Sequence, residues 1–141
     1  MKRYTTAVWS GTVKEGKGYL MSESKALNNM QYSYNSRFEN GTGSNPEELM
    51  AAAHAGCFTM QFSADLTKAD FIPEVLETKC FIIMEDGIIT KSDLNVTAKI
   101  PNISEEEFQK IAQGAKENCP VSKAYKALTI TLDANLDNTI D

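Results

Sequence analysis

The pattern of hydrophobic and polar positions predicts strands at both ends of the chain and a long apolar helix between them. The first 38 residues alternate roughly between the two kinds of residue, and Gly16-Lys17-Gly18 supplies the turn expected between two strands of a hairpin. From Pro46 to about Lys68 the spacing becomes helical. One face of this helix carries Leu49, Ala52, Ala53, Gly56 and Met60. Most of the remaining helix surface is apolar as well, with Met50, Cys57, Phe58 and Phe62. A helix that is apolar nearly all round belongs at the centre of a fold.

The start of this helix is marked by capping residues. Residues 39–45 form a glycine-rich loop, which lacks the Gly-Lys-Ser/Thr ending of a phosphate-binding loop. Asn45 can act as N-cap, and Pro46 stands at the first helical position, where its missing N–H costs nothing. Glu48 is placed to reach back in a capping box, which leaves Glu47 without a structural role.

In the second half of the chain, the sequence pattern predicts two strands, two helical segments and a final strand. Residues 79–84 and 88–100 read as strands around an Asp86-Gly87 turn. Ser104 and Glu107 form a second capping box for an amphipathic helix that ends near residue 118, and residues 120–125 form one further short turn of helix. The alternation over residues 128–136 predicts a strand with one buried face. We therefore predict a single α+β domain over residues 1–141.

Composition and charge narrow the classes of function. With 14 Lys and Arg against 19 Asp and Glu, the net charge of −5 gives the chain no electrostatic reason to bind nucleic acid or anionic lipid. No apolar stretch approaches the roughly 20 residues of a membrane-spanning helix, and the first ten residues lack the apolar core of a secretory signal. We expect a cytoplasmic protein that binds neither nucleic acid nor membrane.

Three cysteines are too few for a disulfide scaffold, so each is buried, catalytic or metal-bound. Cys57 lies too far along its helix for the helix dipole to stabilise a thiolate. To act as a nucleophile it needs a nearby cation, such as Arg37, Lys123 or protonated His54. Cys119 precedes Pro120 and can serve as an N-cap whose sulfur faces backbone N–H groups, which suits the second cysteine of a thiol pair. Composition alone favours a structural role for Cys57, and the spacing does not show whether the two thiols meet.

For Cys80 and His54 the sequence favours a structural role. Cys80 stands among apolar strand residues and reads as a small buried hydrophobe. His54 precedes Cys57 by three residues, which permits a Cys–His pair or half of a metal site, and we expect neither. One histidine and three scattered cysteines give no zinc pattern, so we expect no metal, and the chain contains no Gly-x-Ser-x-Gly elbow of a serine hydrolase.

Several motifs together resemble one known family. They are Gly16-Lys17-Gly18, Glu23-Ser24, Asn35-Ser36-Arg37-Phe38-Glu39, Asn45-Pro46-Glu47-Glu48-Leu49, Ala52-Ala53-His54-Ala55-Gly56-Cys57-Phe58 and Cys119-Pro120-Val121-Ser122. Over essentially its whole length the chain is similar to the OsmC-type family, which comprises osmotically inducible protein C and the organic hydroperoxide resistance proteins. The resemblance implies antiparallel sheets wrapped around a long central helix, in an intertwined dimer with active sites at the subunit interface.

The resemblance also implies a chemistry. It makes the chain a thiol-dependent peroxidase for organic hydroperoxides, with Cys57 as peroxidatic thiol and Cys119 as resolving thiol. Arg37 and Glu47 match the residues with which the family holds the thiolate and positions the peroxide. No cofactor is implied, but an external dithiol such as a lipoyl group must reduce the resulting disulfide.

Helix geometry adds a constraint on Glu47. Ten residues of straight helix separate Glu47 from Cys57 by about 15 Å along the axis and about 80° around it, so both cannot touch one small peroxide from one unbroken helix. Either the helix breaks between them or Glu47 comes from the partner chain, and we predict the second.

Other interpretations of the same residues remain open. The apolar side chains of Met50, Phe58, Met60 and Phe62 fit a lining for an alkyl group, or plain core. The Arg37 and Glu47 side chains fit a surface ion pair of about 0 to 1 kcal/mol. For the whole chain, the alternatives are a non-enzymatic module that binds a small apolar ligand and a general thiol-disulfide oxidoreductase.

Overall fold

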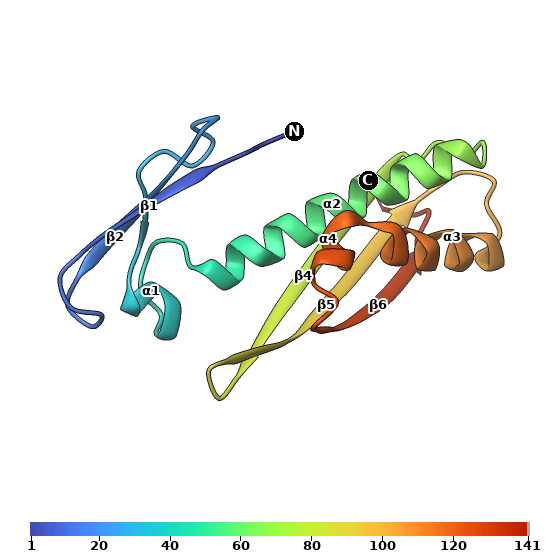
Figure 1. The fold of residues 1–141 in the computed structure, drawn as a ribbon. Helices are drawn as coiled ribbons and strands as arrows, with labels where there is room; N and C mark the ends of the chain where they lie inside the picture. Colours follow the sequence, from blue (N-terminus) through green and yellow to red (C-terminus); the bar gives the residue numbers. More distant parts are fainter. Residues whose placement is uncertain (141) are drawn as a thin grey trace. The chain divides into compact units, whose positions relative to one another are not determined.

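The computed structural model describes residues 1–140, which form two compact units (Figure 1). The first unit is Met1–Leu49 and the second begins at Met50, so the division falls in the first turn of the long helix α2 (Pro46–Lys68). The expectation of a single domain over residues 1–141 stays a prediction. None of the helices in the described part of the chain combines the length and apolar character that crossing a bilayer requires.

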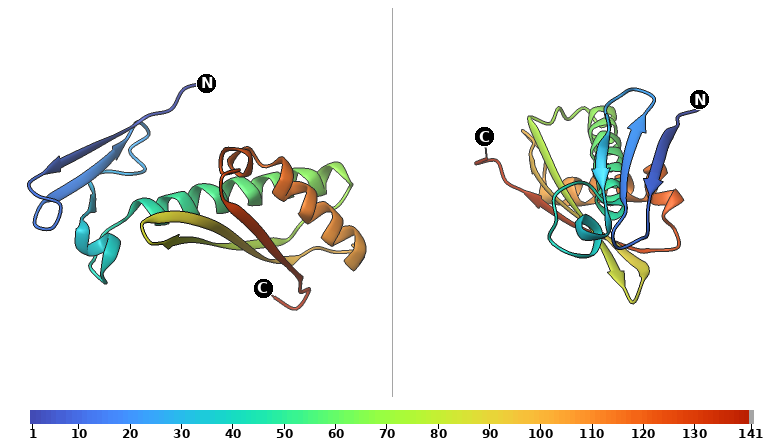
Figure 2. Two further views of the ribbon diagram at one scale, coloured as in Figure 1. Left: turned by 60° about the horizontal axis from the view of Figure 1, so that its bottom comes forward. Right: turned by 90° about the vertical axis from the view of Figure 1, so that its left-hand side faces the viewer.

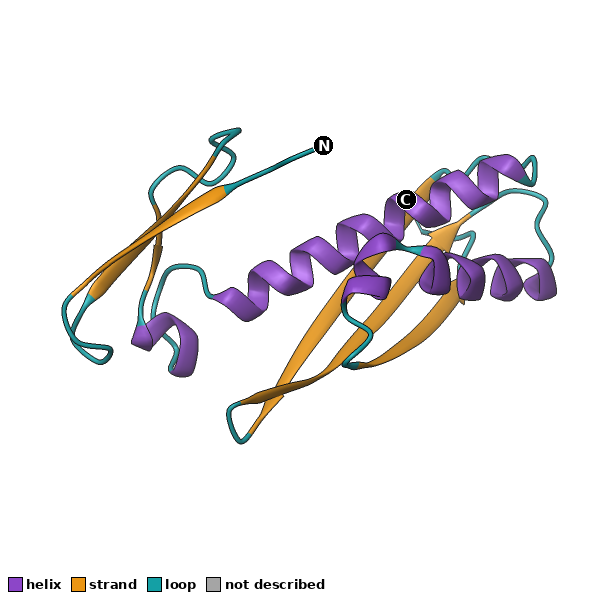
Figure 3. Ribbon diagram, in the orientation of Figure 1, coloured by secondary structure: helices purple, strands orange, loops and turns teal. Residues whose placement is uncertain are grey.

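The first unit is built on a three-stranded antiparallel sheet (Figure 3). Its strands are β1 (Thr5–Ser10), β2 (Lys17–Ser22) and β3 (Met30–Tyr32), in the order β1-β2-β3. The turn lies earlier than predicted, because Gly18 pairs with Trp9 inside the hairpin instead of forming the turn. A Cβ at Gly18 would come within 2.5 Å of the Trp9 ring and 2.7 Å of the Tyr32 ring, so glycine is required for this packing.

A short helix, α1 (Tyr34–Phe38), stands where the sequence pattern predicted strand. Its N-cap is Ser33, whose side chain accepts the Ser36 N–H at 3.1 Å, while Ser36 Oγ accepts the Ser33 N–H at 2.9 Å. This reciprocal pair satisfies two helix-end donors with two serines instead of the usual serine and glutamate. This helix bears on the candidate site because it carries Arg37 in its last turn.

The second unit has a three-stranded sheet in the order β4-β5-β6. Strands β4 (Val75–Glu85) and β5 (Ile88–Lys99) are antiparallel, joined at Asp86 and Gly87, whose φ angles of 53° and 77° suit a tight hairpin turn. Strand β6 (Thr129–Leu136) runs parallel to β5, so this sheet is mixed, whereas the resemblance implied antiparallel pairing. Parallel neighbours need a long crossover, which α3 (Glu105–Asn118) and α4 (Pro120–Ala124) supply.

The core of the second unit lies between one face of this sheet and the helices α2 and α3 (Figure 2). Side chains from α2, β5 and α3 meet there with almost no exposure, and they include Phe58, Phe62, Leu66, Leu94, Val96, Phe108 and Ala112. The buried residues of β5 alternate along the strand, as its sequence predicted. The expected α+β class is therefore confirmed.

Helix α2 has the predicted bounds but buries only one of its faces within the chain. Its buried residues are His54, Phe58, Phe62 and Leu66, each one helical turn after the last. The face predicted from the small residues is open instead: Ala52, Ala53 and Gly56 are exposed, and Met60 is 78% exposed. The large side chains face the sheet because they remove more apolar area from water than alanine or glycine.

Candidate active site

Two thiols that are far apart in the sequence meet in the second unit. Cys57 is half-buried on α2, and its side chain makes a hydrogen bond with Cys119. Cys119 is fully buried at the junction between α3 and α4, with 0% exposure. Both are free thiols. The contact therefore pairs the two thiols that the spacing in the sequence could not pair.

A backbone N–H of α4 also points at Cys57. Cys119 was expected to cap α4 with its own sulfur, but it makes no side-chain cap hydrogen bond. Instead the Val121 N–H donates to the thiol of Cys57. Because Pro120 has no N–H, Val121 supplies the first free donor of α4. This donor was not identifiable from the sequence, since it depends on the contact between α4 and α2.

The thiol of Cys57 has a raised pKa in the isolated chain. Burial is the largest cause, followed by the hydrogen bond with Cys119, while the Val121 N–H acts in the opposite direction and lowers the pKa. Neither Lys123 nor His54 is among the causes of this shift. A nearby positive charge would favour the thiolate of Cys57.

His54 is a fully buried histidine with a partner on each ring nitrogen. Nδ1 lies 2.6 Å from Ser92 Oγ on β5, and Nε2 lies 2.8 Å from Ser122 Oγ on α4. Burial lowers the pKa of the imidazole, so it is neutral at pH 7. The expectation that His54 forms no Cys–His pair is confirmed, because both nitrogens are taken by serines. The described residues contain no group of three or more His, Cys, Asp or Glu side chains suited to a metal ion.

We expect the free energy of unfolding to fall as the pH is lowered below about 6.5, the usual pKa of histidine. The folded-state pKa of His54 is lowered, so the unfolded chain binds a proton first. This contribution to stability is complete above the unfolded pKa and is lost toward the folded pKa, with a limiting slope of about 1.4 kcal/mol per pH unit. Urea denaturation between pH 7.5 and 5.5 measures it, and His54 is the only histidine. A constant free energy over this range would contradict the expectation.

Cys80 has a polar partner that its sequence context did not predict. It is half-buried on β4, and its Sγ lies 3.2 Å from Ser92 Oγ. Burial raises the pKa of this thiol, and Asp93 raises it further, while the Ser92 hydrogen bond acts against both. Cys80 is therefore a poor nucleophile and no part of the Cys57–Cys119 contact.

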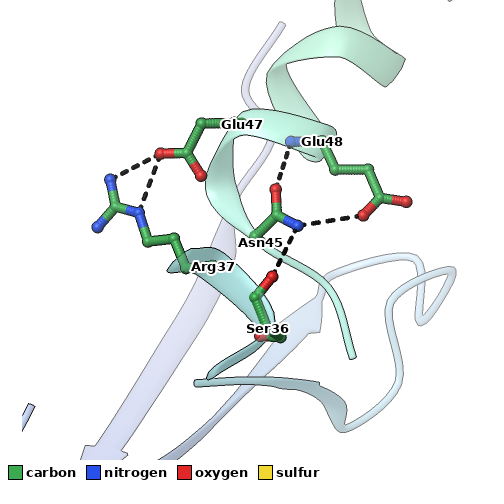
Figure 4. Close-up of polar contacts among 5 residues, drawn as sticks. All are labelled: Ser36, Arg37, Asn45, Glu47 and Glu48. Atoms are coloured by element: carbon green, nitrogen blue, oxygen red, sulfur yellow. Dashed lines mark hydrogen bonds and ion pairs between the residues drawn. The ribbon is translucent and has the colours of Figure 1, made fainter. Parts of the chain in front are cut away.

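Arg37 and Glu47 form an ion pair within the first unit (Figure 4). Arg37 Nε donates to Glu47 Oε1 at 2.9 Å, and Nη2 lies 2.8 Å from the same oxygen. The Glu47 side chain is 14% exposed and that of Arg37 is 38% exposed. The pair is thus more enclosed on the glutamate side than an ordinary surface pair, while the Arg37 side chain keeps contact with solvent.

The cap of α2 leaves Glu47 free for this pair. Asn45 Oδ1 accepts the Glu48 N–H at 2.8 Å, which confirms Asn45 as the capping residue. Glu48 reaches back to the side-chain amide of Asn45 at 3.3 Å, and that amide also donates to the Ser36 carbonyl at 3.1 Å. The cap therefore connects the start of α2 to α1 and fixes the two residues of the ion pair near each other (Figure 4).

An aromatic hollow of about 240 Å³ adjoins Arg37 in the first unit. Most of its lining is aromatic or apolar: Trp9, Val13, Tyr32, Tyr34, Phe38 and Pro46. The Trp9 and Tyr32 rings pack at 5.4 Å, and the guanidinium lies 5.0 Å from the centre of the Phe38 ring. The sequence interpretation sought an apolar lining on α2 instead, where Phe58 and Phe62 prove to be core and Met60 is exposed.

The unbroken course of α2 bears on the position of Glu47. The helix runs without interruption from Pro46 to Lys68, so a break between Glu47 and Cys57 is excluded. At 1.5 Å per residue, the two lie about 15 Å apart along the axis. The remaining alternative, that Glu47 acts on Cys57 of a partner chain, stays a prediction.

The chain is similar to proteins of one family along most of its length. The family model described as OsmC-like protein matches residues 39–133. The sequence is 42% identical to "Peroxiredoxin OsmC" of Escherichia coli (strain K12) over 134 residues, which is 92% of this chain and 93% of that protein. It is 38% identical over 105 residues to an "Organic hydroperoxide resistance protein-like" protein of Staphylococcus aureus (strain USA300), covering 72% and 74% of the two chains.

Solved structures show the same fold. An OsmC like protein from Mycoplasma pneumoniae superposes with a TM-score of 0.76 at 15% identity, over 96% of this chain and 97% of that one. An organic hydroperoxide resistance protein from Elizabethkingia anophelis gives a TM-score of 0.74 at 21% identity, over 97% and 99%.

Proposed function

This chain belongs to the OsmC-like protein family, and on that premise we propose that it is a thiol-dependent peroxidase that reduces organic hydroperoxides to alcohols. The observation that carries the proposal is the contact between the thiols of Cys57 and Cys119. Two relatives support the same activity, since one is named a peroxiredoxin and the other an organic hydroperoxide resistance protein.

The reaction uses both thiols in turn. The Cys57 thiolate attacks the distal oxygen of the hydroperoxide, so the O–O bond breaks, an alcohol leaves and Cys57 becomes a sulfenic acid. The Cys119 thiol then displaces the hydroxyl group as water, and an S–S bond forms. Two thiols of an external dithiol reduce this disulfide and restore the starting state. The Val121 N–H supports this sequence because it stabilises negative charge on Cys57.

Arg37 supplies the cation that Cys57 lacks. We place the Arg37–Glu47 pair of one chain beside Cys57 of a second copy, since the spacing along α2 separates Glu47 from Cys57 of its own helix. Glu47 holds the guanidinium in one orientation through two donors. The guanidinium then lowers the pKa of the thiol and binds the peroxide oxygen.

The exposed face of α2 supports a homodimer. Ala52, Ala53, Gly56 and Met60 form an apolar surface that nothing in the second unit covers, and a Cβ added at Gly56 meets no atom within 4 Å. A second copy of the chain buries this surface and brings its own Arg37 to the site. The dimer thus explains both an uncovered apolar face and a thiol without a cation.

The same site indicates a class of substrate, and the reaction needs an external reductant. The aromatic hollow beside Arg37 accepts the organic part of a hydroperoxide, whereas hydrogen peroxide leaves it empty. No bound cofactor is needed, but each turnover consumes one dithiol, for which we propose a lipoyl-type group. Since a dithiol stays reduced in a reducing compartment, we propose the cytoplasm as the location of the protein.

One assay tests substrate, site and product together. Purified protein with dihydrolipoamide is given cumene hydroperoxide or hydrogen peroxide, and the consumption of each is followed. We expect the organic substrate to react at least about tenfold faster, because only its apolar group fills the hollow. Mass spectrometry of protein oxidised without reductant should identify a Cys57–Cys119 disulfide.

The matched control for this assay is Cys80→Ser. It removes the third thiol, which lies outside the contact, and should leave both rates and the disulfide unchanged. Equal slow consumption of both peroxides, without this disulfide, would contradict the proposal and favour the non-enzymatic apolar-ligand module.

A further inference from the structure

His54 joins three elements of the second unit around the thiol pair. It projects from α2 and is fully buried, with Ser92 of β5 at 2.6 Å from one ring nitrogen and Ser122 of α4 at 2.8 Å from the other. A buried imidazole with two hydroxyl partners has a single well-defined orientation, because turning the ring would leave polar atoms without partners. The role of this residue is not accounted for by the reaction steps above.

The His54–Ser122 contact lies one helical turn from the Cys57–Cys119 contact. His54 precedes Cys57 by three residues on α2, and Ser122 follows Cys119 by three residues at the start of α4. Residues three apart share a helix face, so the same two segments touch at two successive levels. Two contacts fix the rotation of α4 about its axis as well as its distance from α2. That rotation decides where Cys119 and the Val121 N–H point.

The far end of α4 is held near the same imidazole. Tyr125, which follows α4, packs its ring edge-on against His54 with a centroid distance of 5.2 Å. Its hydroxyl donates to the Met50 carbonyl on α2 at 3.1 Å. The His54 ring is therefore at the centre of the contact between α2 and α4.

We infer that His54 is a positioning residue for the thiol pair: anchored to β5 through Ser92, it holds α4 through Ser122 so that Cys119 faces Cys57. This inference rests on the proposed function only in giving Cys119 the resolving role. The inference predicts that formation of the Cys57–Cys119 disulfide depends on the Ser122 hydroxyl.

The test replaces Ser122 instead of His54. Removing the imidazole would leave a cavity in the core and take one hydrogen-bond partner from both Ser92 and Ser122, whereas Ser122→Ala removes one oxygen and introduces a good helix former. Diamide oxidises the thiols without any peroxide: the Cys57 thiolate adds to its N=N bond, and Cys119 then displaces the hydrazine to form the disulfide. We expect Ser122→Ala to slow formation of this disulfide by about tenfold, since loss of orientation is costly for reactions between held groups.

The matched control is Thr59→Val, which removes a part-buried hydroxyl from the same helix. Thr59 Oγ1 lies 2.7 Å from Thr78 Oγ1 on β4 and 2.6 Å from the Ala55 carbonyl oxygen, and neither partner belongs to α4. We expect this variant to close the disulfide within twofold of the unmodified chain, at a similar loss of thermal stability. Equal slowing in both variants would mean general loosening and overturn the inference, as would an unchanged rate in Ser122→Ala.

These measurements distinguish a failure of the positioning role of His54 from a failure of the proposed peroxidase function. Diamide closure does not require peroxidase activity, so a chain that reduces no hydroperoxide can still show the difference between Ser122→Ala and Thr59→Val. That result would overturn the proposed function and keep the positioning role. Hydroperoxide turnover with no difference between the variants would do the reverse.

Discussion

Cys57→Ser should lower the rate of cumene hydroperoxide reduction by at least about a thousandfold, because a serine hydroxyl is far less nucleophilic than a thiolate and the other thiol of the site, Cys119, is fully buried. Cys80 is the only other thiol besides Cys119, and its raised pKa makes it a weak substitute. The expected residual rate is that of the peroxide with the dithiol alone. The measurement is the initial rate of peroxide loss with enzyme at micromolar concentration.

Cys119→Ser should separate the two halves of the reaction. Cys57 still attacks the hydroperoxide, so one equivalent of alcohol per chain is released in a burst, and the sulfenic acid then accumulates because nothing condenses with it. Without a reductant, a sulfenic acid trap should label Cys57 in this variant and not in the unmodified chain. A Cys119→Ser protein with full steady-state turnover, or a Cys57→Ser protein that retains half its rate, would contradict the two-thiol reaction.

The second large effect concerns the origin of the guanidinium. Arg37→Met should lower turnover by about a hundredfold, as expected when one charged donor is lost from a site that stabilises negative charge. Glu47→Gln should reduce it less, because the guanidinium keeps its charge and loses only its carboxylate partner. Both substitutions lie at half-exposed or enclosed side chains of the first unit, where neither removes core packing.

Mixing two inactive variants tests whether Arg37 acts across the subunits. Cys57→Ser and Arg37→Met chains are unfolded together and refolded at equal concentrations. If each site takes its thiol from one chain and its guanidinium from the other, mixed dimers contain one complete site, and about a quarter of the unmodified activity should return. If both groups come from the same chain, every site lacks one of them and no activity returns. The control mixture, Cys57→Ser with Cys119→Ser, should return none, because both changed thiols belong to the same half of the site.

Local capping chemistry explains why the two long helices, α2 and α3, were predictable from the sequence. Asn45 and Pro46 mark the start of α2, and Ser104 with Glu107 marks the start of α3. These signals act within four residues and are independent of the rest of the fold. The Asp86-Gly87 turn is equally local, since its positive φ angles are a property of the two residues.

Features that depend on distant contacts escaped the same analysis. The α1 cap uses two serines, a pairing that the pattern of strands around it concealed. The exposed face of α2 was not predicted because hydrophobic spacing does not show which of two apolar faces meets the sheet. The Val121 N–H and the two serine partners of His54 come from segments brought together only by tertiary packing. The sequence thus singled out residues that the structure brings together in two pairs, Cys57 with Cys119 and Arg37 with Glu47, but it did not predict the geometry of either pair.

The placement of Cys119 in the crossover between β5 and β6 has a consequence for how the chain acquires its disulfide. Cys57 and Cys119 are about 60 residues apart in the sequence, whereas Cys57 and Cys80 are about 20 apart. In an unfolded chain, closing the longer loop is disfavoured by roughly fourfold on loop-closure entropy alone. Oxidation before folding would thus favour the mismatched Cys57–Cys80 pair. A newly made chain should bring Cys119 against α2 before it meets an oxidant, so the hydroperoxide proposed as its substrate would also be a hazard to its folding.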